Sequence, residues 1–158
     1  MSIRDAIDAI AERVETVPDV GHVHRFERLV KDWPAFIETC RVESLGRARW
    51  WIVTRSARTG TADAAGTRRL QQIVVRGHEP FVDTVESERD FQELADLVCD
   101  VFEPPTRLTD RKKLRLTPGF FLDGIPSMIV DPRKVGGVTI HFAEITIPVV
   151  QRDGFCNV

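Results

Sequence analysis

The sequence predicts an α+β fold, in which a mainly antiparallel sheet of long strands is flanked by two principal helices. Residues 138–150 form the longest uninterrupted run of β-branched, aromatic and other apolar side chains. Residues 2–17 and 82–102 instead repeat apolar side chains at helical spacing. A length of 158 residues, with 42% hydrophobic and 29% charged residues, is typical of one globular domain, so we expect residues 1–158 to form a single unit.

The run at residues 138–150 predicts a strand about 40 Å long, at about 3.3 Å per residue. Both of its alternating sets of side chains are apolar, which is typical of a strand that is covered on both faces. We therefore expect a helix on one face and sheet neighbours or a partner subunit on the other. Pro148 has no N–H group, which predicts an edge position or a bulge at this residue.

The predicted helices carry start signals. Ser2 and Asp5 have the spacing of a capping box at the start of the first long helix. Asp32 predicts an N-cap for a short helix that runs to about Thr39. Ser87 predicts a cap within the clearest helical pattern, at residues 82–102.

Residues 48–56 and 70–76 predict two strands that pair as antiparallel neighbours. Residues 57–67 between them offer nothing that can enter a core, which predicts a flexible hairpin tip. The other segments have weaker patterns: a first strand at residues 20–29, two short strands or an ordered loop at 120–130, a turn at 131–134 and a loosely held tail at about 152–158.

Composition narrows the function classes. The net charge of −2 does not favour nucleic acid or an acidic membrane surface as a general partner. The three cysteines (Cys40, Cys99 and Cys156) are odd in number and far apart, which indicates a reducing compartment. The N-terminus is patterned as an amphipathic helix rather than a signal peptide, and no apolar run approaches transmembrane length. These patterns predict an intracellular protein with no membrane partner.

The histidines define a possible metal site. His22 and His24 alternate on a predicted strand, and His141 lies on the long strand three residues before Glu144. Imidazole and carboxylate groups bind zinc or iron, but His141 and Glu144 at this spacing fall on opposite strand faces. The favoured interpretation is surface or interface histidines with no bound metal. A small metal-binding enzyme or sensor that uses His22, His24 and His141 is the alternative.

No pattern in the sequence predicts catalysis. There is no G-x-S-x-G motif, and Cys40 and Cys99 fall on apolar helix faces, where thiols are usually part of the core. The glycines at 60, 66, 136 and 137 belong to no GxGxxG or GK[ST] phosphate-binding loop. We therefore expect no catalytic residue and no cofactor, and a protein that is not an enzyme.

Basic residues gather in two places. The first group surrounds the predicted hairpin and comprises Arg47, Arg49, Arg55, Arg58, Arg68, Arg69 and Arg76. The second comprises Arg107, Arg111, Lys112, Lys113 and Arg115. Either group could contact phosphate, but acidic residues balance them and the interleaved aromatics of a single-strand binder are missing. A solvated or subunit-contacting face is the expectation, and direct nucleic-acid binding is the weaker alternative.

Two further features suggest an interface between subunits. Adjacent strand residues face opposite sides, so we expect at least one indole of Trp50-Trp51 to lie outside a single core and to be exposed at the hairpin base. Glu144 interrupts an apolar run and needs an arginine partner, which a neighbouring subunit could supply. The predicted assembly interface is therefore Trp50, Arg55, Arg58, Arg68, Arg69 and Glu144.

The order of short motifs along the chain resembles that of a known family. These motifs are Pro18-Asp19-Val20-Gly21 before His24, Asp32-Trp33-Pro34-Ala35-Phe36, Trp50-Trp51-Ile52-Val53-Thr54-Arg55, Val75-Arg76-Gly77, Ser87-Glu88 with Phe91, and Gly136-Gly137-Val138 before His141-Phe142-Ala143-Glu144. With the amphipathic N-terminal helix, the chain resembles small tail-terminator or tail-completion proteins of tailed bacteriophages and prophages, the group that includes the lambda-type terminator.

The resemblance implies an α+β protomer that assembles into a ring, typically a homohexamer, at the head-proximal end of the tail. Such a ring ends polymerisation of the tail tube and enables head–tail joining, so its partners are the tail-tube protein and a head-completion or connector protein. The implied location is the virion tail, after synthesis in the host bacterial cytoplasm. The family has no catalytic residues to carry over, and the loop at residues 60–66 becomes an assembly element. A head–tail connector or neck protein is the nearest alternative.

Overall fold

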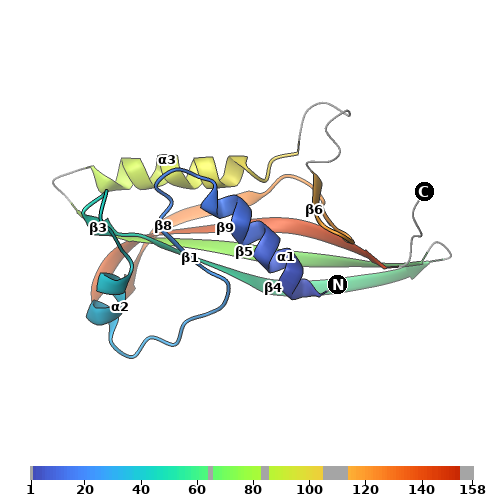
Figure 1. The fold of residues 1–158 in the computed structure, drawn as a ribbon, viewed down its shortest axis with the longest axis horizontal. Coiled ribbons are helices and arrows are strands. Elements are labelled where there is room, and N and C mark those ends of the chain that lie inside the picture. The colour runs from blue at the N-terminus through green and yellow to red at the C-terminus, as the bar shows by residue number, and fades with distance from the viewer. Residues whose placement is uncertain (1, 64–65, 83–85, 105–113, 154–158) are drawn as a thin grey trace.

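The structure, a computed structural model, describes residues 2–63, 66–82, 86–104 and 114–153. The expected α+β fold is confirmed, because the described residues form three helices and a curled, mainly antiparallel sheet of long strands (Figure 1). The helices are α1 (Ile3–Glu15), α2 (Trp33–Thr39) and α3 (Ser87–Asp100). The strands are β1 (His22–His24), β2 (Arg41–Val42), β3 (Arg47–Ala48), β4 (Trp50–Asp63), β5 (Gly66–Pro80), β6 (Arg115–Thr117), β7 (Phe120–Leu122), β8 (Ser127–Val135) and β9 (Val138–Asp153).

Strands β5 and β9 form the centre of the sheet. They pair antiparallel from Thr67 opposite Asp153 to Pro80 opposite Ile140. β4 pairs with the other side of β5, and both β7 and β8 pair with β9. β1 runs parallel to β4, β6 pairs with β7, and β2 and β3 form a separate two-stranded sheet.

The antiparallel pairing predicted for residues 48–56 and 70–76 is confirmed. The prediction of a flexible tip at residues 57–67 is wrong for most of these residues. β4 and β5 stay paired through residues 57–63 and 66–72, with a register shift at Ser56. Residues 64–65 of the predicted tip lie outside the described residues. A strand ladder is held by backbone hydrogen bonds, and β9 supports β5 from the other side, so a segment with no core side chains can still pair.

Pro148 lies in the central strand β9, opposite Gln72 of β5, and not at an edge or a bulge as predicted. In an antiparallel ladder the N–H and C=O of one residue point to the same side. The carbonyl of Pro148 accepts the N–H of Asp123 at 2.9 Å, on the side where β7 ends opposite Val149 and β8 begins opposite Thr146. The missing N–H therefore faces the gap between two partner strands, where no ladder bond is lost.

Other sequence predictions need correction. The first strand is limited to His22–His24, and residues 131–134 lie within β8 rather than in a turn. The chain reverses instead at Gly136-Gly137, where both φ values are positive. Pro132 is tolerated because β9 is the one partner of β8 among the described strands, which makes β8 an edge strand there. β9 continues to Asp153, and residues 154–158 of the predicted tail lie outside the described residues.

The predicted helix starts are partly confirmed. The backbone N–H of Ser2 donates to the Asp5 carboxylate at 2.7 Å, as the capping box predicts. The Asp32 carboxylate accepts the N–H of Ala35 at 3.2 Å and caps α2. α3 differs, because Ser87 is its first residue and the N-cap is Glu86. In the ranges that the structure covers, no helix is both long and apolar enough to cross a membrane.

The sheet is covered on both faces near the α2 end. α1 and α3 cover one face, where Trp51 packs with residues of both helices in the main core (Figure 1). α2 covers the other face, where Trp50 packs with Phe36, Cys40 and Ile140. Trp50 is 1% exposed and Trp51 is fully buried, so the expectation of an exposed indole is wrong. Adjacent strand residues do face opposite sides, but each side has its own core.

His78 is part of the second core. Its ring stacks on Trp50, with the ring centroids 5.0 Å apart, and meets the edge of Phe142. Burial lowers the pKa of His78 to about 4, so the imidazole is neutral at pH 7. The second core therefore contains a titratable group that stays uncharged while the protein is folded.

Replacement of Gly77 by alanine will destabilise the main core. An added Cβ at this position would lie 2.5 Å from the ring of Trp51, which crosses directly over the glycine. We expect Gly77→Ala to lower the free energy of unfolding by about 1–3 kcal/mol in urea titrations. Gly60→Ala is the matched control, because its Cβ would meet no atom closer than 3.8 Å. Equal stability of the two variants would contradict the packing of Trp51 on Gly77.

His78 will make stability depend on pH. Its pKa falls from 6.5 to about 4 on folding, so protonation favours the unfolded chain. The contribution of neutral His78 to the free energy of unfolding is fully present above pH 6.5. It is lost as the pH falls from 6.5 to about 4, by about 3 kcal/mol in total. Urea titrations at several pH values should show a shallower loss for His78→Phe than for the wild type. Identical slopes for His78→Phe and the wild type would refute the assignment.

Candidate functional site

The distal part of the β4–β5 hairpin, residues 55–63 and 66–72, is called the arm below. Figure 1 shows it running on beyond both long helices, α1 and α3. No side chain of the arm belongs to either hydrophobic core cluster. Apart from Gln71, which is buried and bonded to Gln151, the described side chains of the arm form a surface that neither core cluster uses.

The outer side of β4 is an open sheet edge. β1 pairs with β4 only from Trp50 to Ile52. Among the described strands, none pairs with the outer side of residues 53–63. Unpaired N–H and C=O groups along such an edge are a template for another chain. The arginines and the register shift at Ser56 are features that limit indiscriminate pairing there.

The structure brings the four predicted interface arginines onto the hairpin. Arg55 lies opposite Ile73, and Arg58 lies opposite Gln71. Arg69 lies two residues before Gln71 on β5. Directly opposed residues share a face, and so do residues two apart, so these three arginines share the face that α1 and α3 cover further along the sheet. Arg68 points to the opposite face and pairs with Asp123 at 3.1 Å.

A shallow hollow lies at the base of the arm. It has a volume of about 130 Å³, and its lining includes Arg58, Leu70, Asp123 and Pro148. Leu70 is 41% exposed, so the hollow has an apolar wall beside charged groups. A space of this size and mixed character suits a single side chain of a partner.

The remaining two predicted interface residues lie elsewhere. Trp50 is buried under α2, so it forms no exposed contact surface. Glu144 lies on β9 opposite Arg76, whose Nε donates to its carboxylate at 2.9 Å. Arg76 also donates to Glu27 at 2.6 Å. The arginine partner expected from a neighbouring subunit is thus supplied by the same chain.

The three histidines do not form one site. His22 and His24 lie on β1 opposite Trp50 and Ile52, on the α2 face, where His24 Nε2 is 4.0 Å from the thiol of Cys40. His141 lies on the other face, against Phe91 of α3. In the described part of the chain, no group of three or more His, Cys, Asp or Glu residues could hold a metal ion. The alternative site of His22, His24 and His141 is therefore wrong.

A buried ion cluster holds β3, β5 and the start of α3 together. Glu79 is fully buried, and one of its carboxylate oxygens accepts Arg47 Nε at 2.6 Å and Arg49 Nη2 at 3.0 Å. Arg47 also bonds Asp90 of α3, and Arg49 donates to the carbonyl of Asp19 at 2.6 Å. Sequence reasoning assigned these two arginines to a surface group, because no local pattern marks Glu79 as their partner.

Ser87 and His141 form a second buried polar contact. The Ser87 hydroxyl accepts the N–H of Val82 at 3.0 Å and shares a hydrogen bond of 2.8 Å with His141 Nε2, whose direction depends on the imidazole tautomer. Burial lowers the pKa of His141, which favours the neutral imidazole. The contact ties the start of α3 to β9.

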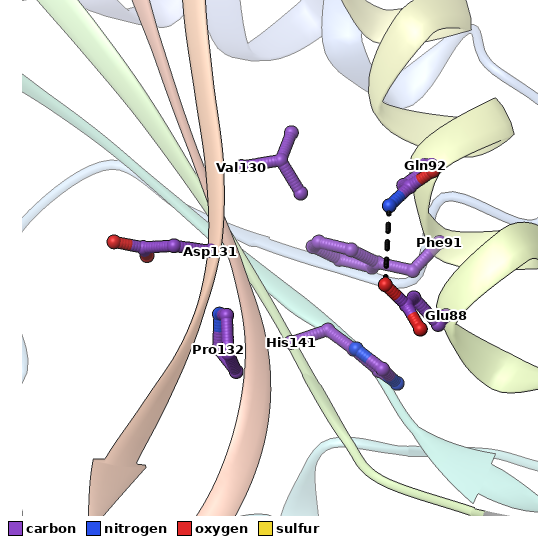
Figure 2. Close-up of a pocket in the computed structure, with 7 residues that line it drawn as sticks. All are labelled: Glu88, Phe91, Gln92, Val130, Asp131, Pro132 and His141. Atoms are coloured by element: carbon purple, nitrogen blue, oxygen red, sulfur yellow. Dashed lines mark hydrogen bonds between the residues drawn. The ribbon is translucent and has the colours of Figure 1, made fainter.

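Figure 2 shows the small pocket next to this contact. Its lining comes from α3 and β9 (Glu88, Phe91, Gln92 and His141) and from β8 (Val130, Asp131 and Pro132). Asp131 points away from the helix in this view, and Glu88 is bonded to Gln92. The volume of about 40 Å³ has room for water but not for an organic substrate. The Ser87–His141 pair therefore acts as a structural link here.

The comparisons with known proteins give no assignment. No protein-family model matches the chain, and no curated protein matches its sequence. The second basic group of the sequence, except Arg115, lies outside the described residues. Among the described residues, the arm with its arginines and open edge is the strongest candidate for a functional surface.

Removal of the Glu79 charge will destabilise the protein. Glu79→Gln leaves the guanidinium groups of Arg47 and Arg49 without their shared buried counter-ion, and we expect a loss of about 3 kcal/mol in the free energy of unfolding. Asp90→Asn is the matched control, since that carboxylate also pairs with Arg47 but is 51% exposed and should cost less than about 1 kcal/mol. Equal losses in denaturant titrations would show that the buried pairing is not the source of stability.

Proposed function

We propose that the chain is a structural assembly protein of a phage or prophage tail. Copies associate into a ring at the head-proximal end of the tail, end the polymerisation of the tube and enable joining to the head. The protein acts through contacts between subunits and not through bond chemistry. The observation that carries the proposal is the arm, a paired hairpin that extends past the helices and has an open edge.

The energetics of the arm support an assembly role. β9 pairs with the β5 side of the arm, but the outer side of β4 has no partner among the described strands, and ordering such a strand costs conformational entropy. The side chains of the arm take no part in the two core clusters that would offset this cost within the monomer. Contacts with another subunit would supply the missing burial and backbone pairing. A hairpin of this kind is therefore well suited to intermolecular contact.

The motifs behind the family resemblance occupy packing positions in the fold. Gly77 accommodates the ring of Trp51, and Gly136-Gly137 makes the turn between β8 and β9. Phe36 and Trp50 pack in the second core. Such positions preserve a protomer shape rather than a reaction centre. This is compatible with a protein that functions by the fit of its surfaces.

The proposal predicts that self-association requires the arm. Residues 59–70 can be replaced by an Asn-Gly dipeptide, which closes a tight hairpin between Arg58 and Gln71. We expect the wild type to form a ring-sized species with rising concentration, or on added tail tubes, in light scattering and electron microscopy. The trimmed variant should stay monomeric and keep the circular dichroism spectrum of a folded α+β protein.

Two outcomes would overturn this assignment. A wild-type protein that stays monomeric at high concentration and does not bind tail tubes is not a ring-forming terminator. A trimmed variant that assembles as well as the wild type would show that the arm is not the assembly element. Asn-Gly replacement removes no residue of either core cluster but does remove the β5 partners of β9 residues 150–153, so the unfolding midpoint of the trimmed variant is the check that it remains folded.

A further inference from the structure

The outer face of α3 carries an acidic stripe. Phe91, Leu94 and Val98 bury the inner side of the helix, and the exposed side chains of Glu93, Asp96 and Asp100 lie on the opposite side. Leu97, next to this stripe, is 51% exposed. An exposed leucine within a row of carboxylates combines an apolar contact with a strongly negative surface, on which the aliphatic part of an arginine can pack.

The arm carries the opposite charge. Arg55 and Arg58 are exposed, and they share one face of the hairpin with Arg69. Among the described residues, Arg55 and Arg58 make no ion pair with an acidic side chain. Within the same residues, the carboxylates of Glu93, Asp96 and Asp100 make no ion pair with a basic side chain. The charges of Arg55 and Arg58 on the arm, and of these three carboxylates on α3, are therefore left without ion-pair partners by the described residues, although the net charge of the chain is only −2.

The two surfaces lie too far apart to meet within one copy. Figure 1 shows the arm at one end of the sheet and α3 over the other end. Their lengths match, because the 14 residues of α3 extend about 21 Å and residues 57–63 of β4 extend about 23 Å. The spacing of charges also matches, with about 10 Å between Arg55 and Arg58 along the strand and about 10 Å between Glu93 and Asp100 along the helix.

We propose that the arm of one copy lies along the acidic outer face of α3 of the next copy, with Arg55 and Arg58 against Glu93, Asp96 and Asp100. The contact joins two different surfaces, so it is heterologous and each copy uses each surface once. Repetition of such a contact gives a closed ring when its rotation closes. The inference rests on the proposed function, since it requires self-association, and it names the two surfaces that meet.

A nucleic acid is the competing partner for the arm. Phosphates would neutralise the arginines, but they would leave the acidic stripe on α3 unexplained and would be repelled by it. A second copy of the chain accounts for both surfaces with one contact. The complementary charges would also speed the encounter of subunits and oppose wrong pairings, such as arm to arm.

Charge reversal tests the contact directly. The arm reversal combines Arg55→Glu with Arg58→Glu, and the helix reversal combines Glu93→Arg with Asp96→Arg. Each should weaken self-association at least about tenfold in sedimentation velocity, because like charges then face each other. One chain that carries all four substitutions has the wild-type net charge and restored complementarity, and it should associate within about threefold of the wild type.

Mixing the two reversal variants gives an independent readout. The acidic arm of one variant fits the basic helix of the other, and the basic arm of the second fits the acidic helix of the first. An equimolar mixture should therefore form assemblies in which the two variants alternate. The matched control is Lys31→Glu with Lys134→Glu, at exposed positions outside the arm, which makes the same change in net charge. This control should assemble like the wild type and should not rescue the helix reversal.

The outcomes separate the inference from the proposed function. A wild type that stays monomeric at high concentration and does not assemble on added tail tubes overturns both. If the wild type assembles, two results would overturn the arm–α3 contact alone. One is that the reversal variants assemble equally well, and the other is that the variant with all four substitutions stays dissociated. The arm reversal could instead keep assembly but lose binding of a fluorescent single-stranded oligonucleotide. That result would assign the arm to nucleic acid and would also overturn the arm–α3 contact. Since all four substituted side chains are exposed, unfolding midpoints should confirm that each variant is folded.

Discussion

The antiparallel pairing of β5 with β9 is the interaction on which the rest of the structure depends. β4 joins the sheet through β5, and β7 and β8 join it through β9. Residues of both central strands, including Ile73, Val75 and Ile145, form the floor on which α1 and α3 pack. The same ladder also continues past the helices into the arm. Backbone hydrogen bonds can extend a sheet further than its side chains can be buried, and this difference produces a packed body with a projecting hairpin.

The covered end of the molecule is built for rigidity. Trp50 and Trp51 enter separate cores on the two faces, and Glu79 places a carboxylate in the interior with Arg47 and Arg49 around it. A buried carboxylate is tolerated only when it is paired, so this cluster fixes the positions of β3, β5 and the start of α3. The Ser87–His141 contact adds a second link between α3 and the sheet. A pair of residues that would suggest catalysis in a large cleft is here part of the packing.

The proposed assembly role follows from where charge and open backbone remain. The arm offers arginines and an unpaired strand edge at one end, and α3 offers carboxylates around Leu97 at the other. Neither surface contributes a side chain to the two core clusters. Evolution could therefore adjust both for contact between subunits without disturbing the cores, since exposed charges contribute little to folding but much to the choice of partner.

Local patterns in the sequence determined the α+β class, the two long helices, the capping of α1 and α2, and the pairing of residues 48–56 with 70–76, because periodicity and caps act over a few residues. They also placed Arg55, Arg58, Arg68 and Arg69 around one hairpin. Only the tertiary structure decided that residues 57–63 are paired, that α2 covers Trp50, that Arg76 neutralises Glu144, and that His24 and His141 lie on opposite faces. The physical reason is that a strand pattern shows which side a residue faces, whereas the element that covers or neutralises that side comes from a distant part of the chain.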